Sequence, residues 1–558
     1  MAKKKNEDTL QYLQMPLPSG GKYSKMTKVS FGGLNKRHTI DSGELSMEKN
    51  ISTLEAPCIV PSHSLEYVYH YDEGCRPIGI FGFDDFLVSI FRYEDAIYVD
   101  YLHTDEDGQV DDLFIGTLQD GGATEDDEYP RSIVQFNVYD TPTDPISGQF
   151  VKKLLIFPDK KSMDFKINSD FVIKDMAVLV KTYTNDTEPY LPPDTASHNY
   201  YYRNLSTKAK EADTLYGAAI YRWVDDDTDS ENSGWKISIP PTMPDIKYAT
   251  VHLSRVFGVD DDRVYASGYN DYTNWNLDTI DEYNEANAWC SPSQSNTKAG
   301  GNFTGITTFD SHVICFKRDF MHEIYNTKNP FRLQDIYAEG CIDNRTIQNV
   351  DGKLIFVSED GVKIYTGSNP RIIDYNLNMS NYTYAVSGTD NRNYYLYCED
   401  AGGNKYLYVY DTFTELWSEQ SIADRVLSFA HNKNGMYMLL KDGHLYKMDT
   451  NDYFTAWSFE TDLITNKTVD IKHIKKLQML VDVATRANFQ VYILYDDEKF
   501  DEKTSHLVYT SKKTGKFPVR VKPRKTANYG FKLHFEGHGY VKLYELEIFV
   551  EAGGGMYV

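Results

Sequence analysis

The amino-acid sequence predicts an all-β protein, a β-propeller with an extended N-terminal arm and a C-terminal antiparallel β-sandwich. From about Gly79 onward, short alternating apolar and polar runs are separated by Asp, Asn and Gly turns, which is the pattern of antiparallel strands. Groups of these runs recur about every 40 to 50 residues, as propeller blades do. After Asp449 the runs become longer, which favours a compact sandwich of about 100 residues.

The chain of 558 residues is too long for a single hydrophobic core, and the changes in pattern divide it into three segments. We expect the arm at residues 1–65, the propeller at 66–455 and the sandwich at 456–558. Six or seven blades are expected. The chain contains 44 tyrosines and 28 phenylalanines, and such a high aromatic content suits pleated surfaces and contact areas better than helix bundles.

Polar turns mark the strand junctions of the predicted propeller. The stretch from Phe86 to His103 is predicted to form two strands around Tyr93-Glu94-Asp95. Further along, TIQNVDGKLIFVSEDGVKIYTG places tight turns at Asp351-Gly352 and Asp360-Gly361, dipeptides that favour left-handed hairpin geometry. Residues 182–232 interrupt the alternating strand pattern, because they are polar, Tyr-rich and acidic. They predict a long insertion between strands, with a short helical piece near Thr207 to Leu215.

The arm is too polar to fold by itself. Residues 1–65 mix Lys, Gly, Ser, Pro and Met, and their apolar residues follow neither a helical nor a strand period. They therefore cannot bury enough apolar surface. We therefore expect this segment to be ordered against a neighbouring subunit or partner protein. Its removal is then expected to spare the propeller and abolish assembly.

Charge and cysteine content narrow the classes of function. The formal net charge of -24 disfavours binding of nucleic acid by phosphate neutralisation, although an acidic wall would let DNA slide past. The six cysteines are scattered without metal-ligand spacing, which favours synthesis in a reducing cytoplasm. No apolar run reaches the length of a membrane span, and the N-terminal lysines precede no apolar core, so neither an anchor nor a secretory signal is expected.

The sequence offers no catalytic, cofactor-binding or metal-binding residues that we can name. Its acidic clusters could supply oxygen ligands for calcium, but none has the spacing of an EF-hand loop, and solvated turns are the simpler interpretation. The 14 histidines form no zinc motif, and the tryptophans are too scattered for a sugar-binding platform. The clusters are Glu125-Asp126-Asp127-Glu128, Asp225-Asp226-Asp227-Asp229 and Asp260-Asp261-Asp262.

Three stretches resemble the stabilisation and tail-nozzle β-propeller proteins of tailed bacteriophages. The first is RVFGVDDDRVYASGYNDYTNWN, at Arg255 to Asn276. The second is the C-terminal stretch FQVYILYDDEKF followed by FPVRVKPRKTANYGFKLHFEGHGYVKLYELEIFVEAGG, and the third is the opening phrase VSFGGLNKRHTIDSGELSMEKNIS. The match lies in this phrasing and includes no catalytic signature. The acidic insertion has no counterpart.

The resemblance implies a non-enzymatic structural protein of the virion, made in the host cytoplasm and placed in the tail or neck. It implies a homo-oligomeric ring, expected to be a hexamer, around the channel through which DNA leaves. Portal, adaptor or tail proteins would be its neighbours, and DNA would pass without specific binding. Two alternatives remain at this stage: a receptor-binding or baseplate protein for host glycans or proteins, and a tail-associated polysaccharide hydrolase.

Charge gives a further expectation for such a ring. An acidic lumen would keep the polyanion off the wall, whereas Lys and Arg would hold it through phosphate contacts. We therefore expect a net negative inner surface, with Asp260 to Asp262 or Asp225 to Asp229 as contributors. The basic stretch from Lys516 to Lys525 is expected to face another protein subunit.

Overall fold

The computed structural model is almost entirely β-sheet, which confirms the predicted fold class. It contains two short 3-10 helices, η2 (Asn344–Thr346) and η3 (Tyr375–Leu377), and no α-helix among the residues it describes. The described residues are 24–27, 31–37, 40, 44–83, 86–94, 96–104, 110–118, 132–140, 149–157, 161–167, 177–181, 218–224, 234–238, 244, 246–272, 274–275, 286–293, 301–337, 339–379, 382–448, 450, 452–453, 456–465, 471–496 and 498–552.

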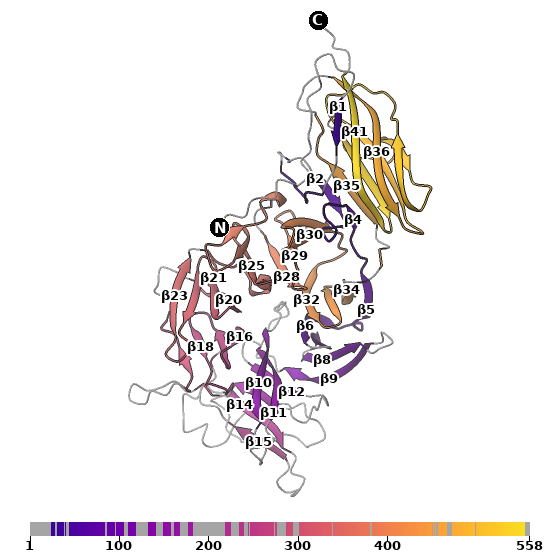
Figure 1. The fold of residues 1–558 in the computed structure, drawn as a ribbon. Helices are drawn as coiled ribbons and strands as arrows, with labels where there is room; N and C mark the ends of the chain where they lie inside the picture. The colour runs from indigo at the N-terminus through magenta and orange to yellow at the C-terminus, as the bar shows by residue number, and fades with distance from the viewer. Residues whose placement is uncertain are drawn as a thin grey trace.

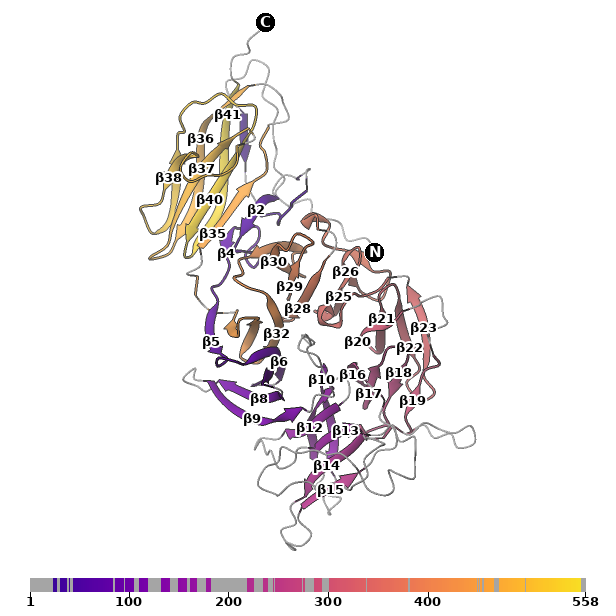
Figure 2. The same cartoon turned by 180° about the vertical axis from the view of Figure 1, so that it is seen from behind.

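Seven antiparallel sheets, built from the described strands, surround a common axis and form the propeller (Figures 1 and 2). In chain order, and from the axis outward, blade one consists of β6 (Arg76–Phe83), β7 (Phe86–Tyr93), β8 (Ala96–Thr104) and β9 (Val110–Leu118). Blade two consists of β10 (Ser132–Asp140), β11 (Gln149–Phe157), β12 (Lys161–Ile167), β13 (Ala177–Lys181), β14 (Ala218–Val224) and β15 (Gly234–Ser238). Blade three consists of β16 (Tyr248–His252), β17 (Arg255–Val259), β18 (Val264–Ala266) and β19 (Trp289–Cys290), and blade four of β20 (Phe303–Phe309), β21 (His312–Lys317), β22 (Met321–Tyr325) and β23 (Arg332–Tyr337).

The remaining blades complete the circle. Blade five is β24 (Gln348–Val350), β25 (Lys353–Ser358), β26 (Gly361–Tyr365) and β27 (Arg371–Ile372); blade six is β28 (Tyr384–Thr389), β29 (Asn393–Glu399), β30 (Lys405–Asp411) and β31 (Leu416–Gln420); blade seven is β32 (Val426–Asn432), β33 (Gly435–Leu440) and β34 (His444–Lys447), with β5 (Glu66–His70) as its outermost strand.

Strand β5 closes the propeller, because it comes from the N-terminal end of the chain and completes the last blade. It pairs antiparallel with β34, with Tyr69 opposite Leu445. The inner strands of blades seven and one also meet: the Ser428 hydroxyl accepts from the Ile80 amide at 2.9 Å and donates to the Ile80 carbonyl at 2.9 Å. A closed circle of sheets leaves no gap at which the blades can separate.

Apolar side chains fill the spaces between neighbouring blades. Val357 of blade five and Tyr394 of blade six belong to one buried cluster, and Tyr397 and Met438 join blades six and seven in another. These inner and middle strands are buried on both faces, so their sequences read as apolar runs such as KLIFVS and GMYMLL.

The two predicted tight turns differ in geometry. Asp351 and Gly352 both have positive φ, 49° and 68°, as expected for the left-handed hairpin turn that joins β24 and β25. In the next hairpin Ser358 pairs with Gly361, so Glu359 and Asp360 form the turn. Gly361 is required there for space, because an added Cβ would lie 2.6 Å from an Asp374 carboxylate oxygen.

The predicted insertion at residues 182–232 falls within blade two, between β13 and β14 for the most part. Its described residues form β14, which pairs with β13 in the six-stranded sheet. The expected helical piece at Thr207 to Leu215 lies outside the described residues.

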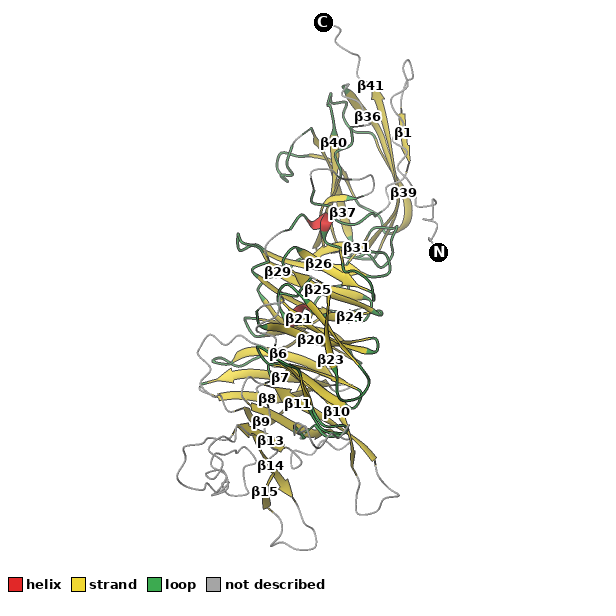
Figure 3. Cartoon of the chain, turned by 90° about the vertical axis from the view of Figure 1, so that its left-hand side faces the viewer, coloured by secondary structure: helices red, strands yellow, loops and turns green. Residues whose placement is uncertain are grey.

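The C-terminal strands form a sandwich beside blade six (Figure 3). One sheet has the order β1 (Ser24–Thr27), β41 (Val541–Ala552), β36 (Lys472–Val483) and β39 (Gly515–Val521). The other has the order β2 (Leu45–Lys49), β35 (Ala456–Thr461), β40 (Phe531–His538), β37 (Asn488–Tyr495) and β38 (His506–Thr510), and a small hairpin of β3 (Ile51–Ser52) and β4 (Val60–Pro61) packs nearby.

The described part of the N-terminal arm is held by its own chain, which corrects our expectation that a neighbouring subunit orders it. Strand β1 pairs with β41, and β2 pairs with β35. Four apolar side chains of the arm enter the sandwich core: Phe31, Leu45, Ile51 and Ile59. A segment that is too polar to fold alone can still add strands to a sheet that already exists. Residues 1–23 lie outside the described residues.

Replacing Gly82 with alanine tests the closing junction. An added Cβ on Gly82 of β6 would overlap the backbone of His431 in blade seven. We expect Gly82→Ala to lower the free energy of unfolding by about 1 to 3 kcal/mol, because a methyl group forced into a packed junction shifts the backbone. Chemical unfolding measures this. Gly402→Ala is the control, since its Cβ would come no closer than 3.1 Å, to the Asp400 side chain. Equal losses in both variants would contradict the tight junction.

Candidate functional site

A cavity of about 250 Å³ lies where the inner strands converge on the propeller axis. Residues from six blades line it, among them Ser132, Arg345 and Ser387. The charged groups that line it, Arg345 and Asp343, neutralise each other: the guanidinium donates to Asp343 from Nη2 at 2.6 Å and from Nε at 3.0 Å. Arg345 also lies over the Tyr384 ring at 4.9 Å. These polar groups are already satisfied within the propeller, so the cavity offers little charge to a ligand.

Side-chain hydrogen bonds join neighbouring blades around this axis. The Thr308 hydroxyl of blade four donates to the Val251 carbonyl of blade three at 3.0 Å, and Gln348 of blade five donates to the Ser387 carbonyl of blade six at 3.1 Å. The inner strands expose one edge of backbone amide and carbonyl groups to the axis, and these side-chain hydrogen bonds satisfy some of those groups. The axial residues therefore stabilise the propeller.

One face of the propeller gathers acidic turns. Each blade has an even number of strands, so every inner strand runs in the same direction and the turns between second and third strands share one face. The described residues of these turns include nine acidic and three basic side chains. The acidic ones are Glu94, Asp260, Asp261, Asp262, Asp319, Glu359, Asp360, Asp400 and Asp442, and the basic ones are Arg263, Arg318 and Lys441. We call this surface the acidic face.

The first-to-second-strand turns that the structure describes lie on the opposite face and are nearly balanced in charge. Their described residues carry three acidic side chains, Asp310, Asp351 and Asp390, and two basic ones, Arg392 and Lys433. On the acidic face, the local structure favours the charged form of the Asp400 carboxylate. Hydrogen bonds from Asn404 and from backbone amides of its own loop lower the pKa of Asp400. These two sets of described turns therefore differ in net charge.

The sequence-predicted cluster Asp260-Asp261-Asp262 belongs to the acidic face, and its carboxylates have partners. Asp260 accepts from the amides of Asp262 and Arg263 at 2.7 and 2.6 Å, which builds the turn. Lys247 contacts Asp261 at 2.6 Å. These hydrogen bonds agree with the interpretation of this cluster as a turn between strands. The clusters at Glu125 to Glu128 and Asp225 to Asp229 lie outside the described residues.

Within the described ranges, no three His, Cys, Asp or Glu side chains are grouped so that they could hold a metal ion. The four described tryptophan side chains, Trp275, Trp289, Trp417 and Trp457, are buried in separate parts of the protein. The six cysteines are free thiols, and burial raises the pKa of Cys341 to about 12. Among the helices of the described ranges, none has the length and apolar character to span a bilayer.

A partly buried charged cluster couples the arm to blade six, and sequence reasoning missed it. We call it the clasp and define it as Lys36, Glu48 and Lys49 of the arm with Tyr408 and Glu419 of blade six. Lys36 contacts the Glu419 carboxylate at 2.6 Å and the Tyr408 hydroxyl at 2.8 Å, and Lys49 also binds Glu419. Glu48 accepts from the Glu419 amide at 3.0 Å. No sequence signal relates these residues, which lie about 370 positions apart.

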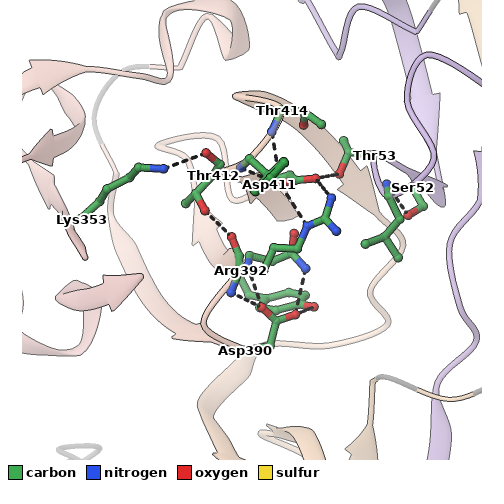
Figure 4. A network of polar contacts seen from close by, with 12 residues as sticks. Ser52, Thr53, Lys353, Asp390, Arg392, Asp411, Thr412 and Thr414 are labelled. Carbon is green, nitrogen blue, oxygen red and sulfur yellow. Dashed lines mark hydrogen bonds and ion pairs between the residues drawn. The ribbon is translucent and has the colours of Figure 1, made fainter. Parts of the chain in front are cut away.

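A second network anchors the arm beside the clasp (Figure 4). Asp411 is fully buried, and Arg392 donates to its two oxygens at 3.2 and 2.7 Å. The Thr53 hydroxyl of the arm donates to the same carboxylate at 3.1 Å. Asp390 fixes the neighbouring turn by accepting from the amides of Arg392 and Asn393. The Asp411 carboxylate therefore has donors from both the arm and blade six.

The predicted basic stretch lies on the sandwich. Lys516 and Arg520 are exposed on β39, and Lys522, Arg524 and Lys525 are exposed in the turn that follows it. This places the basic stretch on a different domain from the acidic face.

Comparisons with known proteins give no family for this chain. No family model matches it, and no curated protein matches it. Among solved structures it is similar to BamB from Moraxella catarrhalis, at 10% identity and a TM-score of 0.33, covering 70% of this chain and 98% of that one. It is also similar to a candidate 6-phosphogluconolactonase from Bacteroides uniformis, at 10% identity and a TM-score of 0.26, covering 57% and 92%. Similarities this weak carry no functional argument.

The clasp predicts a pH-dependent effect of Glu48→Gln. Burial raises the pKa of Glu48 well above its ordinary value, so the folded protein favours the protonated carboxyl. This contribution to stability is present below the unfolded-state pKa and is lost as pH rises through the folded one. Glutamine keeps the acceptor for the Glu419 amide without the charge. We therefore expect the variant to match the parent near pH 4 and to be more stable at pH 8, by at least about 1 kcal/mol.

Chemical unfolding at the two pH values measures the effect. Glu415→Gln, at an exposed turn position 60% accessible, is the control and should show no such difference. A variant that is less stable than the parent at pH 8 would contradict a protonated, buried Glu48.

Proposed function

We propose that this protein is a non-enzymatic structural component of a tailed-bacteriophage particle, forming a ring in the tail or neck around the DNA exit channel. The observation that carries the proposal is the acidic face. Nine acidic side chains on one set of propeller turns suit a wall past which a polyanion must move without sticking. The sequence resemblance to tail-nozzle proteins supplies the biological setting.

The junction between the domains supports the same proposal. A ring that carries DNA under load needs subunits whose parts do not move against each other. The clasp and the Asp411 network tie the propeller, the arm and the sandwich together through buried polar contacts. Removing one partner of such a buried pair is costly, so these contacts resist separation.

In the ring we propose, the acidic face lines the lumen and the propeller axis carries no DNA. The axial cavity of about 250 Å³ holds its own hydrogen-bonded side chains, so DNA would pass between subunits around the ring axis. Six copies are the number that we propose.

Imaging of assembled particles by electron cryomicroscopy tests the proposal. We expect density for this chain in a closed ring on the tail axis, with more acidic than basic side chains facing the lumen. A trimer at the distal end of the tail would instead indicate the receptor-binding alternative. A lumen with more basic than acidic side chains would overturn the proposed role of the acidic face even in an axial ring.

A further inference from the structure

The sandwich has one strongly basic edge in an otherwise acidic protein. Residues 503–535 contain nine Lys and Arg and no Asp or Glu, although the whole chain has a net charge of -24. Seven of these side chains are exposed along β39 and its flanking turns, and we call them the basic edge: Lys512, Lys513, Lys516, Arg520, Lys522, Arg524 and Lys525.

Within the described residues, the basic edge has no ion-pair partner. Lys516 instead lies over the Tyr544 ring at 3.9 Å. Seven like charges on a short stretch repel one another, so a surface of opposite charge would bind here with a gain in free energy.

Strand β39 also has a backbone edge that no other described strand covers. It pairs with β36 on one side and is the last described strand of its sheet. Such an edge can accept another strand, and charged side chains normally prevent this from happening between identical edges. Lys and Arg on β39 disfavour a second β39 and favour an acidic strand.

One outer strand of the propeller has the complementary charge. Strand β9 is outermost in blade one and carries Asp111 and Asp112. It lies within residues 105–130, which contain ten Asp and Glu and no Lys or Arg. Among the other outer strands, β15, β23 and β27 carry a Lys or Arg, β19 carries no charged residue, β5 carries a single Glu, and β31 is covered by the arm.

We propose that the basic edge binds strand β9 of a second copy of this chain. The sandwich of each copy packs beside its own blade six, whereas β9 belongs to blade one, so the partner strand comes from another molecule (Figure 2). The contact combines charge complementarity with pairing of two free strand edges. It rests on the ring proposed above, because it supplies a contact between ring subunits.

A DNA duplex is the other polyanion that a basic edge could meet. A protein with a net charge of -24 repels DNA at a distance, whereas the free backbone edge of β39 can be satisfied by a strand and gains nothing specific from phosphates. These features favour the protein partner.

Charge reversal with mixing tests the proposal on the full chain. Arg520→Glu with Lys522→Glu reverses two charges of the basic edge and lowers its net charge from +7 to +3, and Asp111→Lys with Asp112→Lys reverses both charges of β9. Sedimentation velocity at low salt should show self-association of the parent, weakened at least about tenfold in each variant alone because the charge complementarity of the contact is then reduced. An equimolar mixture of the two variants should recover association, because the intact basic edge of one faces the intact β9 of the other.

Arg332→Glu with Arg486→Glu is the control. These two exposed side chains lie on neither strand and give the same change in charge as the basic-edge variant, so association should stay within about twofold of the parent. Circular dichroism and the thermal transition report folding of each variant. If the β9 lysine variant does not fold, Asp111→Asn with Asp112→Asn should still weaken association and its salt dependence.

Several results would overturn the proposal: a monomeric parent at low salt, unchanged association in either reversed variant, or a mixture that does not recover. Fluorescence anisotropy with a labelled DNA duplex is run in parallel. Binding that Arg520→Glu with Lys522→Glu abolishes, while self-association persists, would assign the basic edge to nucleic acid instead. If the mixture recovers association but the protein is not found in the tail of particles, the proposed function is rejected and the proposed contact between copies is retained.

Discussion

Closure of the propeller by β5 is the constraint on which the rest of the structure depends. Because β5 pairs with β34, the chain enters and leaves the propeller at the same blade. The two connecting segments therefore lie side by side, and the Ser64 amide donates to the Asp452 carbonyl at 2.8 Å. The residues before β5 and after β34 emerge together and can fold into one sandwich, although more than 380 positions separate them in sequence.

The shared sandwich explains why charged residues are buried at the domain junction. The arm must cross blade six to reach β35 and β41, and it brings Lys36, Glu48 and Lys49 against Glu419. Holding these charges at the junction is acceptable because each has an opposite partner or a backbone donor, and burial raises the pKa of Glu48, the carboxyl with least compensation. The junction that results fixes the acidic face and the basic edge relative to each other within one subunit.

Sequence reasoning identified the features that repeat or that depend on local geometry. Alternating runs and turn dipeptides predicted the propeller, because a hairpin such as Asp351-Gly352 is specified by its own backbone preferences. For the described part of the arm, the prediction that a neighbouring subunit orders it was wrong, because polarity indicates that a segment does not fold alone but not which sheet it will join. The clasp could not be predicted, because Glu48 and Glu419 are ordinary charged residues until closure by β5 brings their segments together.

Removal of residues 1–61 tests most directly whether closure makes the sandwich a joint product of both chain ends. Hydrogen–deuterium exchange of the truncated and parent proteins measures each domain separately. The propeller keeps β5, so its amides should remain protected. The sandwich loses β1 and β2 and four core side chains, Phe31, Leu45, Ile51 and Ile59, so β35, β36 and β41 should exchange faster by at least about tenfold. Unchanged protection of these three strands would contradict the account.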